Sequence, residues 1–126
     1  MAAPPPLHLE DTMAGPEPGT RLATLEDLRK KGAQDITFRS GDHQVRIFLI
    51  VHGDEILAYE NRCPHAGTPL NLYGPDFFNQ SGKLLLCRTH GALFEPTDGQ
   101  CRRGPCKGQY LRRIAIDIDG DSIVSA

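Results

Sequence analysis

Three segments between positions 35 and 60 are rich in β-branched and aromatic residues, and turn-forming residues separate them. They run from Asp35 to Arg39, from Gln44 to Val51 and from Glu55 to Glu60. The turns are Ser40-Gly41-Asp42 and His52-Gly53-Asp54. Short strands joined by tight turns of this kind pair with their neighbours along the chain. The pattern therefore predicts a three-stranded antiparallel meander.

Shorter patterns on either side of this meander predict one helix and two further strands. Thr24 is suited to cap a short helix, and Gly32 is suited to end it. Near the other end, Leu111 to Ile118 alternates apolar and polar residues, as in a strand with one buried face. Asp119-Gly120 then forms a turn into a last strand, Ser122 to Val124. The predicted elements are mainly strands.

The remaining sequence divides into a proline-rich start and a long insert. Residues 1–19 contain five prolines and little apolar content, which predicts a disordered tail. Residues 61–108 are dense in Gly, Pro, Cys and His, so this insert needs a staple other than an ordinary apolar core. We therefore expect one domain over 20–126, with a β base formed by 20–60 and 109–126 that carries the insert.

Size and charge exclude several classes of function. A chain of 126 residues fits one domain, and a formal net charge of −2 argues against a nucleic-acid binder that works through bulk positive charge. No apolar run approaches the roughly 20 residues of a membrane-spanning helix. Residues 1–10 show no secretory signal, so the cytoplasm is the expected location. No nucleophile–base pair or pair of carboxylates points to an enzyme.

The insert contains two similar loops that each offer one thiolate and one imidazole. Cys-Pro-His-Ala-Gly occupies 63–67 and Cys-Arg-Thr-His-Gly occupies 87–91. The glycine that ends each motif permits backbone conformations near a bound group that other residues disfavour. Two cysteines and two histidines bind either a zinc ion or a two-iron, two-sulfur cluster with both thiolates on one iron. The candidate ligands are Cys63, His65, Cys87 and His90.

The residues around these candidate ligands resemble the Rieske [2Fe–2S] family. The matching stretches are Cys63 to Leu70 and Cys87 to Phe94, followed by Asp98-Gly99 and by Gly104-Pro105, where the family places a third loop over the cluster. The resemblance implies an all-β fold, in which a rubredoxin-like cluster-binding subdomain is inserted into an antiparallel β base. It also implies one [2Fe–2S] cluster as the cofactor, with four ligands: Cys63, His65, Cys87 and His90.

Four positions differ from other branches of the family. Quinol-oxidising members carry a disulfide between the two loops, but the matching residues here are Thr68 and Thr89. High-potential members carry a serine and a tyrosine whose hydroxyls donate to cluster sulfurs, and the matching residues here are Ala92 and Phe94. Donors to sulfur stabilise the reduced state, so their absence predicts a low potential for this type of cluster. The chain is therefore most similar to the ferredoxin branch.

The resemblance implies a soluble electron-transfer protein, similar to a ferredoxin that passes single electrons to an oxygenase or a reductase. The expected partners are a donor reductase and an acceptor oxygenase or reductase, and neither nucleic acid nor a membrane is expected. The residues alone leave open a zinc-stapled interaction module and an iron–sulfur sensor without a role in electron transfer. A basic run is interpreted as a solvated face, or else as a patch that steers an acidic partner: Arg102, Arg103, Lys107, Arg112 and Arg113.

Two further cysteines, Cys101 and Cys106, flank Gly104-Pro105. Their spacing of four intervening residues allows a small closed loop but matches neither ligand loop. Packing, a mutual disulfide and redox tuning are the roles open to them. We expect packing or a disulfide, and we do not expect either cysteine to be a metal ligand.

Overall fold

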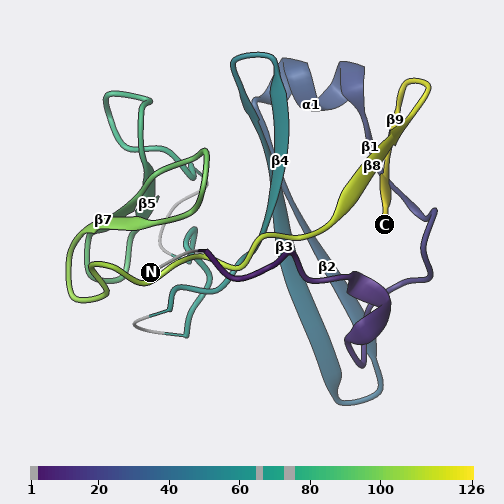
Figure 1. The fold of residues 1–126 in the computed structure, drawn as a ribbon, viewed down its shortest axis with the longest axis horizontal. Helices are drawn as coiled ribbons and strands as arrows, with labels where there is room; N and C mark the ends of the chain where they lie inside the picture. Colours follow the sequence, from purple (N-terminus) through teal and green to yellow (C-terminus); the bar gives the residue numbers. More distant parts are fainter. Residues whose placement is uncertain (1–2, 65–66, 73–75) are drawn as a thin grey trace.

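The computed structural model describes residues 3–64, 67–72 and 76–126. Within these residues, nine strands form three antiparallel sheets of three strands each, so the predicted all-β class is confirmed (Figure 1). The helical elements are η1 (Leu9–Asp11) and α1 (Leu25–Lys31). The strands are β1 (Arg21–Thr24), β2 (Ala33–Ser40), β3 (His43–His52), β4 (Glu55–Glu60), β5 (Leu85–Cys87), β6 (Ala92–Phe94), β7 (Cys101–Arg103), β8 (Ile116–Asp119) and β9 (Ser122–Ser125).

The central sheet has the order β2-β3-β4 and confirms the predicted meander. Successive side chains of β3 point to opposite faces of this sheet. Phe48 and Ile50 pack into one core with residues of the insert, whereas Ile47 and Leu49 pack into a second core with α1 and β9. All four side chains are fully buried. Because both faces of the sheet are covered, the part of β3 from Ile47 to Val51 is a continuous apolar run that does not alternate.

The second sheet has the order β1-β9-β8, and it lies on the other side of the central sheet from the insert (Figure 1). Its strand β9 follows the predicted turn at Asp119-Gly120, but β1 has only four residues and was not predicted. The predicted strand over 111–118 is too long, because only the residues of β8 pair with β9. Leu111 instead donates its N–H to the Gly99 carbonyl at 2.9 Å, so this stretch crosses between the insert and the base.

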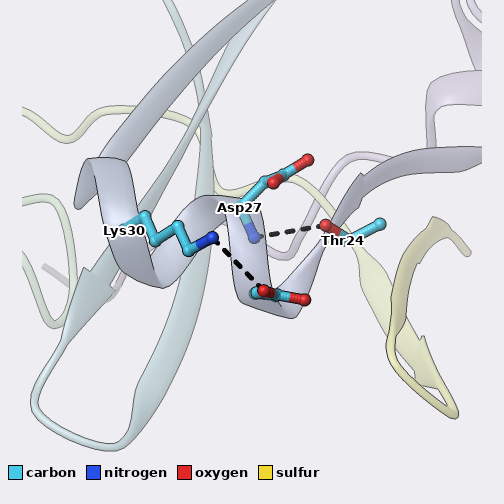
Figure 2. Close-up of polar contacts among 4 residues, drawn as sticks. Thr24, Asp27 and Lys30 are labelled. Atoms are coloured by element: carbon cyan, nitrogen blue, oxygen red, sulfur yellow. Dashed lines mark hydrogen bonds and ion pairs between the residues drawn. The ribbon is translucent and has the colours of Figure 1, made fainter.

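The helix begins and ends at the predicted residues. The Thr24 hydroxyl accepts the N–H of Asp27 at 3.2 Å, and Lys30 pairs with Glu26 at 3.2 Å one turn away (Figure 2). Gly32 ends the helix with a φ of 79°, the left-handed conformation that glycine adopts most readily. The helix has seven residues. In the described part of the chain, no helix has the length and apolarity that crossing a bilayer requires.

The start of the chain packs against the base, which differs from the disordered tail predicted for 1–19. Leu7 donates its N–H to the Arg113 carbonyl at 2.7 Å and accepts the N–H of Ala115 at 2.9 Å. Leu9 is fully buried in the second core. The high proline content obscured this role, because the apolar surface that anchors the segment comes from only two residues, Leu7 and Leu9.

The insert contains the third sheet, of order β5-β6-β7, and its other described residues form turns and loops. Its strands have three residues each. The insert packs on the face of the central sheet that Phe48 presents, where Phe77 stacks on the Phe48 ring with centroids 4.4 Å apart and planes 15° apart. This contact fixes the insert, and with it the candidate ligands, to the rigid central sheet.

Candidate metal centre

The first ligand loop leaves β4 and folds back on itself around Cys63. The Cys63 N–H donates to the Thr68 carbonyl at 2.8 Å, and the Gly67 N–H donates to the Cys63 carbonyl at 2.7 Å. Gly67 has a φ of 70°, so the predicted need for glycine here is confirmed. The Cys63 side chain is only 1% exposed and belongs to the core shared with Phe48.

The second ligand loop is the tight turn that joins β5 to β6. Cys87 is the last residue of β5 and pairs with Ala92 across the ladder. The Gly91 N–H donates to the Cys87 carbonyl at 2.9 Å, and Gly91 has a φ of 76°. Cys87 is fully buried, whereas His90 is exposed at the tip of the turn. The turn therefore places a thiol inside the protein and an imidazole on its surface.

Two hydrogen bonds join the loops to each other. The Arg88 N–H donates to the Leu70 carbonyl at 3.1 Å, and the hydroxyl oxygens of Thr68 and Thr89 lie 3.0 Å apart. The two threonines occupy the positions where the quinol-oxidising relatives carry their disulfide. A non-covalent contact thus stands where those relatives have a covalent bond.

Asn61 braces the first loop from inside. Its Oδ1 accepts the N–H of Leu70 at 2.8 Å, and its Nδ2 donates to Asn71 Oδ1 at 3.0 Å. The residue is only 4% exposed, so these bonds satisfy a buried amide that would otherwise destabilise the fold. Sequence reasoning missed this residue. The available signal was its position, as the first residue after β4 and two residues before Cys63.

The third loop lies directly on the second. Gly104 has a φ of 109°, and a Cβ atom placed on it would lie 2.9 Å from the Cα of Ala92. Only glycine permits so close an approach of the two backbones. The structure thus places the Gly104 loop against the start of β6, whereas its predicted position over the cluster stays a prediction.

Cys101 and Cys106 are both buried and free of any disulfide. The Cys106 thiol donates to the Cys101 sulfur at 2.8 Å. Burial, and secondarily the contact with Cys101, raises the pKa of Cys106 to about 12. Its thiol is therefore protonated at neutral pH and packs as a small apolar group. Packing is one of the two roles expected for this pair, the other being a mutual disulfide.

His65 lies outside the described residues, so the structure places three of the four candidate ligands. Cys63 and Cys87 share one buried core, and His90 lies on the solvent side of the second loop. In the described ranges, no three His, Cys, Asp or Glu side chains gather around a point where a single ion would bind. A two-iron cluster divides its ligands, with thiolates on one iron and imidazoles on the other. The chemistry of the donors, two buried thiols and a solvent-facing imidazole, fits that division.

A β base that carries two loops with Cys and His donors is the arrangement of a small iron–sulfur protein. The family model of the Rieske [2Fe-2S] domain matches residues 20–117. The chain belongs to the Rieske [2Fe–2S] domain family, which confirms the resemblance and the expected cofactor, one [2Fe–2S] cluster. As a Rieske domain, it is an electron-transfer protein.

Solved structures of Rieske proteins share this fold at low sequence identity. The ferredoxin of carbazole 1,9a-dioxygenase from Nocardioides aromaticivorans IC177 has a TM-score of 0.66 and 23% identity, covering 88% of this chain and 98% of that one. The plasma membrane Rieske protein PetC3 from Synechocystis PCC 6803 has a TM-score of 0.61 and 23% identity, and the match covers 85% of this chain and 98% of that one. The complex of reduced oxygenase and oxidized ferredoxin in carbazole 1,9a-dioxygenase contains a chain with a TM-score of 0.65 and 20% identity. This match covers 84% of this chain and 90% of that one. No curated protein sequence matches the chain.

Proposed function

We propose that Cys63, His65, Cys87 and His90 hold the [2Fe–2S] cluster, and that the chain is a soluble ferredoxin that passes single electrons to an oxygenase or a reductase. The observation that carries this proposal is the change in exposure between Cys87, fully buried, and His90, exposed three residues later. A thiolate held in the core is protected from exchange, and an imidazole at the surface shortens the path of an electron to a partner.

The chain's own residues act by holding and orienting the two loops. Asn61 and the Thr68–Thr89 contact fix the loop backbones, and the stack of Phe77 on Phe48 fixes the insert to the base. When bound, the cluster supplies a site that stores one electron. Among the described candidate ligands, His90 is the exposed one, so we assign the docking surface of the partner to the tip of the second loop.

The charge distribution supports an acidic partner surface. Residues 61–108 contain six Lys and Arg against three Asp and Glu, a net charge of +3. The rest of the chain contains eight Lys and Arg and thirteen Asp and Glu, which gives a net charge of −5. The protein is thus polarised, and its positive end is the one that carries the second loop. Such a distribution orients a negatively charged partner toward the cluster end during encounter. The exposed basic residues at this end are Arg62, Lys83, Arg102, Arg103 and Lys107.

The relatives support the same role. One similar chain is a ferredoxin in a complex with an oxygenase, by the description of that structure. Another is described as a plasma membrane protein, so the family itself does not fix the location. We propose the cytoplasm for this chain, on its likeness to ferredoxins.

The proposal is tested by electron transfer from the reduced protein to small charged acceptors. Anaerobically purified protein is first titrated with dithionite, and we expect one electron per chain. Stopped-flow oxidation by anionic ferricyanide should then be faster than oxidation by a cationic cobalt complex of similar potential. Added salt should slow the first reaction and speed the second, because salt screens the attraction and the repulsion at the cluster end. A colourless protein that takes up no electron is the result expected of a zinc module and would refute the proposal.

A matched pair of variants separates local charge from total charge. Arg103→Glu reverses a charge in the insert, and Arg39→Glu makes the same change in β2, where Arg39 is also exposed. Arg103→Glu should slow the reaction with ferricyanide several-fold at low salt, whereas Arg39→Glu should change it little. Equal effects of the two variants would refute the docking surface at the tip of the second loop.

A further inference from the structure

We propose that Cys101 and Cys106 form a reversible dithiol–disulfide site in the third loop, separate from the cluster ligands. Both thiols are buried, at 2% and 1% exposure, and their sulfur atoms are 2.8 Å apart. A disulfide bond is about 2.05 Å long, so closure requires the two sulfurs to approach by less than about 1 Å. The proposed function uses neither residue.

The backbone already holds the two cysteines in the arrangement that a bridge needs. The Cys101 N–H donates to the Gln109 carbonyl at 2.7 Å, and the Gly108 N–H donates to the Cys101 carbonyl at 3.1 Å. The Gln109 N–H donates in turn to the Cys106 carbonyl at 2.8 Å. These three hydrogen bonds hold the backbone of Cys101 against residues 106–109, so the segment between the two cysteines forms a closed loop. A cross-link therefore imposes little new order on the native loop.

The reaction that we propose is thiol–disulfide exchange with a small disulfide such as oxidised glutathione. Cys101, which accepts a hydrogen bond from the Cys106 thiol, attacks the small disulfide as its thiolate, forms a mixed disulfide and releases one small thiol. Cys106 then loses its proton, displaces the other small thiol and closes the bridge. Two protein thiols lose two electrons and two protons in total, and one small disulfide is reduced to two thiols. Both thiols are buried, so exchange requires the exposed stretch from Arg102 to Pro105 to move aside and admit the small molecule.

Closure of this bridge would act on the cluster end through the third loop. Gly104 lies against Ala92, the residue that pairs with Cys87. A bridge from Cys101 in β7 to Cys106 encloses Gly104 and so restrains the loop at this contact. We expect the bridged protein to release its cluster several-fold more slowly to a chelator than the dithiol form. The site would thus link the thiol redox state of the surroundings to the lifetime of the cluster.

The test is a titration of the cluster-loaded protein in anaerobic buffers of graded ratios of reduced to oxidised glutathione. Samples are quenched in acid, alkylated after denaturation and analysed by intact mass and by peptide mapping, while visible absorbance follows the cluster. We expect a protein lighter by two hydrogen atoms, with two of the four cysteines protected and both protected sites mapped to Cys101 and Cys106. Alkylation of all four cysteines at every ratio would overturn the proposal. So would glutathione adducts that never give way to an internal bridge.

Two single variants keep the result interpretable. Cys106→Ser leaves the attacking Cys101 without its partner and should stop at a mixed disulfide, whereas Cys101→Ser leaves only the protonated Cys106 thiol and should react far less. Neither variant should show an internal bridge. Absorbance distinguishes failure of this site from failure of the proposed function, because the bridge is read from the thiols and the cluster from its colour. Protection that maps to Cys63 or Cys87, together with loss of colour, would show that oxidation attacks the ligands, and would overturn the proposal.

Discussion

The hydroxyl oxygens of Thr68 and Thr89 lie 3.0 Å apart, and this contact joins the two ligand loops. A hydrogen bond of this kind contributes about 0.5–1.5 kcal/mol, whereas a native disulfide contributes about 2–4 kcal/mol. The two loops are therefore held together less firmly than those of the quinol-oxidising relatives. Their association depends more strongly on the bound cluster.

Removal of either hydroxyl should accelerate release of the cluster. We expect Thr68→Val and Thr89→Val each to raise the rate of release to an iron chelator by roughly 2- to 12-fold, which corresponds to the free energy of one hydrogen bond. The double variant should be no faster than the faster single variant, because both changes remove the same contact. Thr97→Val, at an exposed position, is the control. Additive effects in the double variant would show that the contact is not shared.

The potential of the cluster should depend on positions 92 and 94. Ala92 pairs with Cys87, and Phe94 is fully buried two residues further along β6. Neither side chain offers a hydroxyl that stabilises the reduced state. Phe94→Tyr and Ala92→Ser should each raise the potential, and together by on the order of 100 mV within a family range of about −150 to +300 mV. Protein-film voltammetry measures this, with Phe38→Tyr in β2 as control. No rise in either variant would contradict the explanation.

Tyr59 links β4 to the turn after β6, because its hydroxyl donates to the Pro96 carbonyl at 2.6 Å. Burial raises the pKa of Tyr59 to about 12, above the value of about 10 expected in an unfolded chain. A raised pKa in the folded state means that its contribution to stability is complete below about pH 10 and is lost as the pH rises toward 12. Thermal unfolding between these values should show a falling midpoint.

Tyr59→Phe separates this ionisation from other alkaline effects. The variant should lose about 1–3 kcal/mol at neutral pH, because the buried Pro96 carbonyl loses its donor. Its midpoint should fall less steeply than that of the wild type between about pH 10 and 12. Some alkaline loss should remain, since burial also raises the pKa of Cys106 to about 12. Parallel curves for the two proteins would contradict the assignment.

The base could be predicted from the sequence because its information is local. Thr24 caps the start of α1 and Gly32 ends it, and both roles follow from the residue type. The apolar pattern and the turns between its segments determine β2 to β4. The strand predicted over 111–118 was wrong only in its first part, 111–115, because alternation predicts a strand without identifying its partner. The Leu111 N–H bonds to Gly99 instead, across a sequence separation that no local pattern reveals. The packing of Leu9 was missed for the same reason, since burial depends on a distant core.

The candidate ligands followed from their spacing, but the residues that brace them did not. Asn61 is an ordinary polar residue in the sequence, and only the fold shows that it satisfies the Leu70 N–H. The contact between Thr68 and Thr89 spans 21 positions and was expected only as the absence of a disulfide. Ligand chemistry leaves a signature in a short motif, whereas support by neighbouring side chains depends on the three-dimensional path of the chain.

The insert should depend on the cluster more strongly than the base does. The second core, which contains Leu9 and Leu49, contains no candidate ligand, whereas the first includes both Cys63 and Cys87. Metal binding supplies folding free energy where an apolar core is thin. In hydrogen exchange on the apoprotein, amides of β5 to β7 should lose protection before those of β2 to β4. Simultaneous loss across all three sheets would indicate a single cooperative unit.

The central claim is that two histidines, His65 and His90, ligate the cluster together with two cysteines. Electron–nuclear double resonance of the reduced protein, grown with nitrogen-labelled histidine, counts the coordinated imidazole nitrogens directly. We expect two coordinated imidazole nitrogens in the wild type and also in His43→Gln, a control at an exposed position in β3. We expect one coordinated imidazole nitrogen in each of His65→Cys and His90→Cys. A wild-type spectrum without histidine coupling, or variants that keep both couplings, would contradict the assignment.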